Sequence, residues 1–388
     1  MDLQKQEDWT TAFNKNWERY GKYYQRSETR DMAKNYVRGL LSDIPKKNGW
    51  QLAEAVGLED ARGLQRVMAG SIWDAGQLRG EVRQQVTEEM GTEHGIGVID
   101  ESGFVKWGDK SAGVSRQYCG RIGKLENCQV GVYLGYVTET CAAFLDCRLY
   151  LPKTWTDDRE RCQAAQVPDA LGFQTKPQIA LAMLEQAWRE GVPMQWVVGD
   201  SLYGNSPGLR NAIDEHGRYY VMALGSSHQA LVGQAALRQD VTALADQIPA
   251  TQWETLVFRL SEKGPLAYEW AAIRVSMPHD QVGEQWLIGQ RSLGTEPTLR
   301  LWLSNAPDDI PLSDLAAVAL ARHPIEELIE EAKSELGMAD YEVRYWSAWH
   351  RHMTLVMLAH TWLKLLQHDQ RQKKLRWQNG LDKEGKWT

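Results

Sequence analysis

The chain has 388 residues, of which 43% are hydrophobic and 24% charged, a composition typical of a globular protein with more than one domain. It contains no run of about 18 apolar residues and begins with a polar segment of mixed charge. We therefore expect no membrane span, no signal peptide and a cytoplasmic location. The net charge of −7 argues mildly against nucleic-acid binding by the whole surface, so the local distribution of charge matters more.

Residues 1–95 have the pattern of short amphipathic helices, which predicts a helical N-terminal domain. Within it, Gln51 to Val67 has the pattern of a helix, a turn at Gly57 and a second helix, as in helix-turn-helix DNA readers. An ordinary helical bundle fits the same pattern. We expect this domain to bind DNA.

Residues 96–205 change to a β pattern, with strands at GIGVID, NCQVGVYLGYVT and CAAFLDCRLYLP. A helix is expected from Lys176 to Glu190, followed by a further strand at MQWVVGD. This order predicts an α/β fold. Two of the strands end on an acid, Asp100 and Asp200, although an acid before Ser and Gly also commonly starts a turn or caps a helix.

Residues 206–305 contain short β-like runs separated by turn residues, which predicts a β-rich insertion. Four tryptophans lie in or beside these runs, and we expect core packing for each of them. They are Trp253, Trp270, Trp286 and Trp302.

Residues 306–345 return to helix, with Pro324 at a first helical position and Gly337 at a C-cap. Seven residues separate Glu326 from Lys333, so the two lie about 20° apart on one helical face. Arg322 joins that face if the helix extends back through Pro324. Residues 346–388 are expected to form a helical, basic C-terminal region.

Two stretches concentrate positive charge, from Lys106 to Lys124 and from Arg344 to the C-terminal end. Solvated faces would explain both stretches, but basic side chains are also the groups that contact DNA phosphates. The candidate DNA-binding residues are Lys110, Arg116, Lys124, Arg322, Lys333, Arg344 and Arg351.

Spacing argues against two common kinds of site. The five cysteines are odd in number and never form a Cys-x-x-Cys pair, so we expect buried, reduced thiols. Gly103 and Gly108 have P-loop spacing, but Asp109 stands where the lysine should follow, so no nucleotide cofactor is expected.

Asp100, Asp200 and Glu326 together offer hard oxygen ligands suited to Mg²⁺ or Mn²⁺. Two such ions about 4 Å apart can activate a water and stabilise a leaving 3′ oxygen in phosphodiester cleavage. The three acids are therefore the candidate catalytic and metal-binding residues.

Several whole segments carry a family resemblance, namely VIDESGFVKWGDKSAGVSRQYCGRIGKLENCQVGVYLGYVT, LYLPKTWTDDRERC, VVGDSLYG and PIEELIEEAKSELGMADYEVRYWSAWHRHMTLVMLAH. They resemble DDE transposases of the IS701 group, within the IS4-like superfamily. The similarity extends from about Asn35 to Leu363. Arg322, Glu326 and Lys333 match the superfamily's Tyr-x2-Arg-x3-Glu-x6-Lys signature, and Ala319 replaces its tyrosine.

The resemblance implies an RNase H-like catalytic core interrupted by the β-rich insertion, with Asp100, Asp200 and Glu326 as its catalytic acids. It also implies two metal ions per site, cleavage of double-stranded transposon ends, joining to target DNA and a homodimer on DNA. In relatives, a base can be flipped onto a tryptophan of the insertion. A domesticated transposase that only binds DNA, and an RNase H-like nuclease without strand transfer, are the alternatives.

Overall fold

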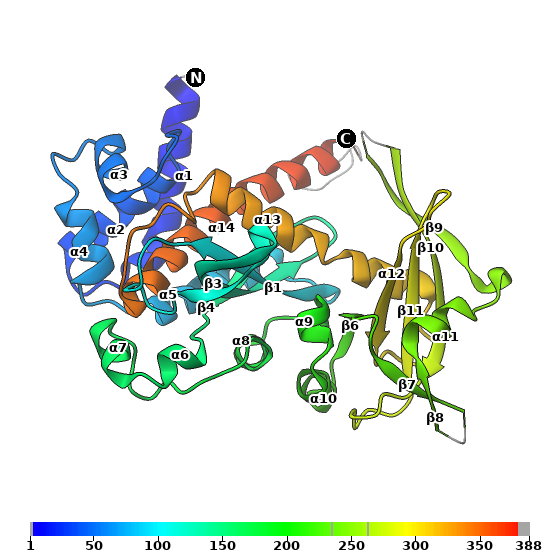
Figure 1. Ribbon diagram of the computed structural model, residues 1–388. Coiled ribbons are helices and arrows are strands. Elements are labelled where there is room, and N and C mark those ends of the chain that lie inside the picture. The colour runs from blue at the N-terminus through cyan, green and yellow to red at the C-terminus, as the bar shows by residue number, and fades with distance from the viewer. Residues whose placement is uncertain (1–2, 234–235, 262–263, 379–388) are drawn as a thin grey trace.

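The computed structural model describes residues 3–233, 236–261 and 264–378 (Figure 1). In Figure 1 the N-terminal helices lie at one end of the molecule, a mixed sheet lies in the middle, and strands β9 to β12 lie at the other end. The fold is thus of the predicted mixed α/β class. Among the described residues, no helix is both long and apolar enough to cross a membrane.

Helices from both ends of the chain pack against one another. Phe13 lies against Trp362 with ring centroids 6.1 Å apart, and the hydroxyl of Tyr36 is 2.8 Å from Nδ1 of His352. These contacts join residues more than 300 positions apart, so the C-terminal helix completes the N-terminal helical core. The helices are α1 (Leu3–Gly21), α2 (Ser27–Leu40), α3 (Gly49–Ala55), α4 (Arg62–Ala69), α5 (Ala75–Met90) and α14 (Trp346–Gln378).

The predicted helix, turn and helix between Gln51 and Val67 are formed by α3 and α4. The side chain of Asn48 caps α3 by accepting from the backbone N–H groups of Trp50 and Gln51. Gly57 has a φ of 76°, in the left-handed region that glycine adopts without strain. Whether this pair of helices reads DNA stays a prediction.

The central sheet is mixed. Strand β1 pairs antiparallel with β3 and parallel with β5, β5 pairs parallel with β6, and β4 pairs antiparallel with β3. The strand order is β2-β3-β1-β5-β6-β12-β11-β10-β9. The bounds are β1 (Gly95–Val105), β2 (Ser115–Cys119), β3 (Lys124–Val137), β4 (Ala142–Leu149), β5 (Met194–Gly199), β6 (Tyr219–Leu224), β9 (Glu254–Ser261), β10 (Gly264–Val275), β11 (Gln285–Ser292) and β12 (Leu299–Ser304).

Both faces of the sheet are covered by helices. Along β1, Val98 belongs to the apolar cluster that contains Ile325, whereas the next residue, Ile99, belongs to the cluster that contains Ile179 and Met183. Successive strand residues point to opposite faces, so this alternation separates the side on which α13 packs from the side on which α8 packs. These helices are α12 (Leu312–Leu320), α13 (His323–Ser334), α6 (Lys153–Thr156), α7 (Arg159–Ala164) and α8 (Lys176–Arg189).

Strand β6 belongs to the central sheet, although the sequence analysis assigned residues 206–305 to the insertion. It lies parallel to β5, with Val198 opposite Val221. The helices α9 (Ser201–Gly204) and α10 (Pro207–Glu215) make the crossover between these strands. Two parallel strands need such a crossover between them. The helices after Asp200 therefore lead back to β6, which continues the central sheet.

The remaining segment adds antiparallel strands to the same sheet, because β12 pairs with β6 and continues into β11, β10 and β9. A separate hairpin and short helix accompany it, namely β7 (Gln229–Val232), β8 (Leu237–Asp240) and α11 (Val241–Asp246). Trp270 and Trp302 are buried here as expected, and Trp253 and Trp286 are partly buried. All five cysteines are free thiols, and four of them are buried.

Gly204 is expected to be essential for the approach of α9 to β6. A Cβ at this position would collide with the backbone carbonyl oxygen of Ala223, which cannot move aside as a flexible side chain could. Gly204→Ala should therefore lower the free energy of unfolding by about 1–3 kcal/mol, measured by urea denaturation. Gly208→Ala is the matched control, because nothing lies within 4 Å of a Cβ there, and equal stability losses in the two variants would contradict the prediction.

Candidate active site

Parallel pairing of β1 and β5 brings two of the predicted acids together. Ile99 is in register with Gly199, and Asp100 and Asp200 are the residues that follow them. Neighbouring strands lie about 4.8 Å apart, so the two acids start from adjacent backbone positions at the same edge of the pairing. Oδ1 of Asp200 also caps α9 by accepting from the N–H of Leu202 at 2.9 Å. Asp200 therefore both caps a helix and starts from a backbone position next to Asp100.

The alternation along β1 decides which helix Asp100 faces. Asp100 is two residues after Val98 on β1, so both side chains point to the same face. That is the face on which Ile325 of α13 packs. The start of α13 lies there, and Arg322 at its N-cap has helical dihedral angles. The predicted backward extension of the helical face through Pro324 therefore holds at Arg322.

Arg322 links the first strand acid to the helix acid. Its Nη2 atom lies 2.9 Å from Oε1 of Glu326 and 3.8 Å from Oδ2 of Asp100. The guanidinium stands between two carboxylates from elements more than 200 positions apart. Among the residues that the structure describes, no group of three or more Asp, Glu, His or Cys side chains is close enough to hold a metal ion. Positive charge at this site comes from Arg322.

The pKa values of both strand acids are raised. Burial raises the pKa of Asp100 to about 7, and the negative charges of Asp200 and Glu101 add to this effect, whereas Arg322 opposes it. Burial and the nearby Glu101 also raise the pKa of Asp200. Burial is the main cause of both shifts, and acids with raised pKa values that lie beside other charged groups are common at functional sites.

Lys333 lies on the same side of β1 as Asp100. Its ammonium is 2.5 Å from the hydroxyl oxygen of Ser102 and 5.2 Å from the ring centroid of Phe104. Ser102 and Phe104 are the next residues on that face of the strand. The predicted face of α13 that carries Arg322, Glu326 and Lys333 therefore runs along β1.

Sequence reasoning missed a second charged group on the opposite face of β1. Glu101 accepts from Nζ of Lys176 at 2.7 Å, and both side chains are largely shielded from solvent. Next to them is the buried Tyr203, whose pKa is raised well above its ordinary value by burial and by Glu101. The strand period could have revealed this group, because an acid after Asp100 must face α8 and needs a cation there.

The other predicted DNA-binding residues lie in two kinds of place. Lys110, Arg116, Lys124 and Arg344 are exposed. Arg351 differs, since its guanidinium donates to the carbonyls of Met68 and Trp73 at 3.0 Å each. Those bonds hold α14 against the N-terminal helices, so Arg351 is not part of the candidate DNA surface.

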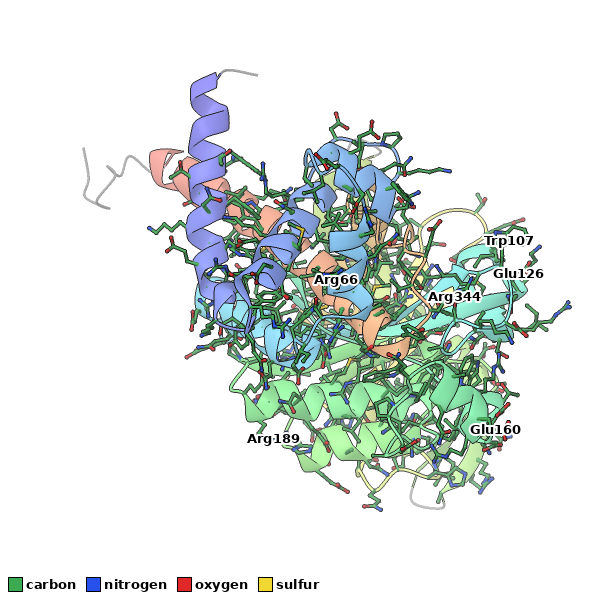
Figure 2. All side chains as sticks on the ribbon, turned by 90° about the vertical axis from the view of Figure 1, so that its left-hand side faces the viewer. Arg66, Trp107, Glu126, Glu160, Arg189 and Arg344 are labelled. Carbon is green, nitrogen blue, oxygen red and sulfur yellow. The ribbon has the colours of Figure 1, made fainter. Side chains whose placement is uncertain are left out.

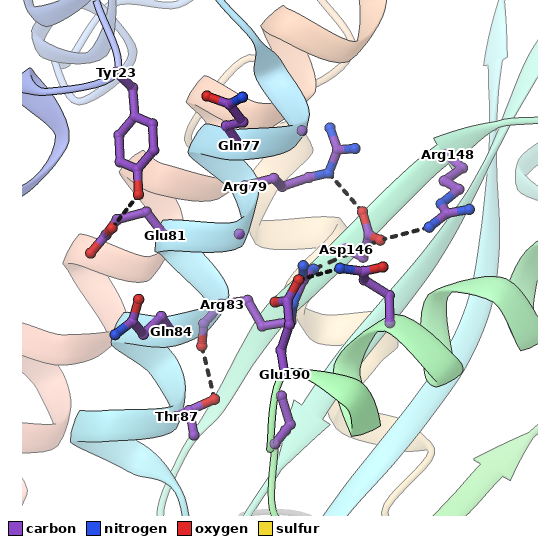
Figure 3. A pocket seen from close by; sticks show the side chains of 14 residues that line it. Tyr23, Gln77, Arg79, Glu81, Arg83, Gln84, Thr87, Asp146, Arg148 and Glu190 are labelled. Atoms are coloured by element: carbon purple, nitrogen blue, oxygen red, sulfur yellow. Dashed lines mark hydrogen bonds and ion pairs between the residues drawn. The ribbon is translucent and has the colours of Figure 1, made fainter.

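A pocket of about 660 Å³ lies between α5, β4 and α8, away from the three acids (Figure 3). Its side chains pair with one another. Arg79 contacts Asp146 at 2.6 Å, and Arg83 contacts Glu190 at 2.6 Å. Because Asp146 is buried beside Arg79, Arg148 and Arg83, its pKa is lowered in spite of burial. These paired charges fasten α5 to the sheet.

The chain matches the family model of the DDE superfamily endonucleases over residues 19–256, which is more than half of its length. It therefore belongs to the DDE superfamily of endonucleases. The matched range includes Asp100 and Asp200 and ends before Glu326.

A probable transposase for insertion sequence element IS701, from Microchaete diplosiphon, is 27% identical over 315 residues, which are 79% of this chain and 75% of that protein. The predicted resemblance to the IS701 group is thereby confirmed. Among solved structures, the NurA nuclease from Sulfolobus solfataricus aligns with 66% of this chain and 91% of its own, at 11% identity and a TM-score of 0.25. That similarity is too low to inform the fold.

The raised pKa of Asp100 predicts a pH-dependent loss of stability in metal-free buffer. An ordinary aspartate ionises at 3.8, whereas Asp100 in the folded protein ionises at about 7. Between these values the unfolded chain has released a proton that the folded chain retains, so folding becomes less favourable as pH rises. Asp100→Asn removes this effect, and its stability relative to the wild type should grow from pH 4 to 7 and then level off.

The stability of Asp100→Asn relative to the wild type should increase by a few kcal/mol over this pH range, because each unit of pKa shift corresponds to about 1.4 kcal/mol. It is measured as the difference in thermal unfolding between the two proteins, in EDTA, at a series of pH values. Asp109→Asn is the control, because that side chain is 77% exposed and should give no such trend. A difference between Asp100→Asn and wild type that stays constant from pH 4 to 8 would contradict the raised pKa.

Proposed function

We propose that this protein is a transposase that cuts the DNA ends of its own insertion sequence and joins them to target DNA. Membership of the DDE endonucleases and similarity to a probable transposase support this proposal. The observation that carries it is the placement of Asp100 and Asp200 at adjacent strand positions, with Glu326 linked to Asp100 through Arg322. Asp100 and Asp200 thus start from adjacent backbone positions, and Arg322 lies between Asp100 and Glu326.

The proposed core is RNase H-like. Three antiparallel strands, β1, β3 and β4, lie beside the parallel strands β5 and β6, in the order β4-β3-β1-β5-β6. Strands β9 to β12, which follow β6 and precede α13, form the β-rich insertion of this proposal. Such a scaffold suits phosphodiester chemistry, since strands hold side chains more precisely than loops do.

The residue types of the site suit Mg²⁺ or Mn²⁺, and binding of two ions would require the three acids to lie closer together than they do in this structure. All three candidate ligands are carboxylates, which are hard oxygen donors. The raised pKa values of Asp100 and Asp200 mean that added positive charge would stabilise their ionised forms. When bound, such ions supply an activated water and stabilise the leaving 3′ oxygen.

The chain's own residues would then hold substrate and ligands. Glu101 pairs with Lys176 on the opposite face of β1 and adds a negative charge close to Asp100 and Asp200. Arg322 compensates Asp100 and Glu326 in the free protein, and with cations in the site its guanidinium becomes available to a DNA phosphate. Lys333 extends this cationic face along β1.

Other parts of the chain are assigned to DNA binding. In this proposal, residues 1–95 recognise the ends of the element. Lys110, Arg116, Lys124 and Arg344 contact the DNA backbone, because all four are exposed. Two ends must be held together for joining, which calls for a homodimer on DNA. No nucleotide cofactor is required.

The proposal is tested by incubating the protein with a duplex that carries the terminal sequence of the element, read from the DNA that flanks the gene. We expect nicking at the element's end that depends on Mg²⁺ or Mn²⁺, followed by joined products when target DNA is added. Asp200→Asn and Glu326→Gln should each reduce nicking by at least about a hundredfold, because either change removes a proposed ligand.

Glu327→Gln is the matched control for Glu326→Gln. It changes the adjacent glutamate of the same helix, whose side chain is 53% exposed and contacts His323 instead of Arg322. This variant should cut as the wild type does. Cutting without joining would leave a nuclease in place of a transposase. Tight binding of the ends with no cutting in either metal would favour a domesticated DNA-binding protein.

A further inference from the structure

Trp107 is almost completely exposed. Its exposed fraction is 98%, although tryptophan is among the residues that proteins bury most extensively. It follows Val105, the last residue of β1, and begins the basic stretch identified in the sequence. Figure 2 shows Trp107 at the edge of the molecule, on the same side as Glu126 and Arg344.

The backbone on both sides of Trp107 is held in place. Asn127 of β3 donates through its side-chain amide to the carbonyls of Lys106, at 2.7 Å, and Gly108, at 2.8 Å. The N–H of Lys106 donates to the carbonyl of Asn127 at 3.0 Å. Gly108 has a φ of 81°, which turns the chain immediately after the tryptophan. The indole is thus displayed by an anchored turn.

Lys106 anchors the turn from its other side. Its ammonium donates to the carbonyl of Tyr341 at 2.9 Å and lies 3.4 Å from the centroid of that ring. Tyr341 is buried in the apolar core, so Lys106 connects the turn directly to the centre of the protein.

The surface around the turn combines positive charge with apolar side chains. Its exposed cations are Lys110, Arg116, Lys124 and Arg344, and the acids near them include Asp109, Glu126 and the exposed Glu342. Exposed Tyr118 and Leu125 lie on the neighbouring hairpin of β2 and β3, in register with each other. Arg344 reaches this region because its carbonyl accepts from the N–H of Ala112 at 2.9 Å.

Strand β1 connects this surface to the active site. Trp107 follows Asp100 by seven residues, so at about 3.3 Å per residue the two lie at most roughly 23 Å apart along the chain. One turn of duplex DNA is about 34 Å long, so a duplex bound along the direction of β1 would span both positions within one turn. Asp100 lies on β1, and Trp107 lies in the turn that leaves the end of this strand.

The tryptophans of the insertion are engaged in packing. Trp270 and Trp302 are buried. The ring of Trp253 lies 3.7 Å from the guanidinium carbon of Arg291, and the indole N–H of Trp286 donates to the carbonyl of Pro307. Trp107 therefore offers an indole face that these four side chains do not.

We propose that Trp107 stacks on an unpaired nucleobase of the DNA substrate, while the neighbouring cations contact the flanking phosphates. An aromatic side chain in a cationic setting stacks on any base, because every base has a π-face. This assignment depends on the proposed function as a DNA-cutting enzyme. Nucleic acid complements both parts of this surface, since its phosphates pair with the cations and its bases stack on the indole.

The test uses two fluorescent duplexes with the element's terminal sequence, one fully paired and one with three unpaired nucleotides beside the cleavage position. Each carries 2-aminopurine in that segment, whose fluorescence falls when the base stacks on an aromatic ring. The wild type should bind the unpaired probe more tightly and quench it. Trp107→Ala should not quench the probe and should bind it about five- to hundredfold more weakly than the wild type. Trp107→Phe should retain part of the quenching and part of the affinity.

The dependence of binding on salt separates stacking from charge. Trp107→Ala should leave the slope of log affinity against log salt unchanged, because it removes no phosphate contact. The double variant Lys110→Ala with Lys124→Ala should reduce that slope by about 2 and keep the preference for unpaired bases. Both positions are exposed, so folding is checked simply by comparing thermal unfolding with the wild type.

Two results would overturn the stacking assignment alone. Trp107→Ala could bind and quench both probes as the wild type does while the wild type still cuts paired ends, which would leave the transposase proposal intact. Alternatively, Trp107→Ala could convert a dimer into a monomer in sedimentation without changing the preference between probes, which would make Trp107 a subunit contact. A wild type that binds neither probe and cuts nothing would refute both proposals.

Discussion

The parallel pairing of β1 with β5 is the constraint on which the site depends. It places Asp100 beside Asp200 although a hundred residues separate them, and it fixes the face on which α13 presents Arg322. Burial of Asp100 raises its pKa to about 7, and the nearby charges of Asp200 and Glu101 add to this effect. In this arrangement Arg322 supplies positive charge between Asp100 and Glu326.

The rest of the structure supports this pairing from outside. Buried Lys47 donates through its ammonium to the carbonyls of Leu40 and Glu335, and thereby ties the end of α2 to the segment that leaves α13. On the other side, Arg79 joins α5 to β4 through Asp146. Each of these buried charges is paired or fully hydrogen-bonded, which burial in a protein interior demands. The N-terminal helices and the central sheet are therefore packed together at these contacts.

Much of the site could be predicted from local pattern. A strand that ends on an acid is visible in GIGVID and VVGD, and the seven-residue spacing of Glu326 and Lys333 places both on one helical face. Other features cannot be predicted without knowing which distant residues lie next to each other in the fold. The carbonyls that bind Arg351 belong to residues about 280 positions earlier, and β6 joins the sheet through a crossover that its short sequence does not announce. Local pattern therefore placed Arg351 among DNA contacts and β6 in an insertion.

The sequence by itself determined the class of elements, the acids available for catalysis, the concentration of positive charge after Asp100 and the family. These depend on residue type and on spacing along one strand or helix, where geometry repeats with a fixed period. Only the tertiary structure decided that Arg322 stands between Asp100 and Glu326, that Glu101 faces Lys176, and that Trp107 is displayed while the insertion tryptophans pack. These features depend on which distant side chains contact one another, and the sequence pattern of a single strand or helix does not contain that information.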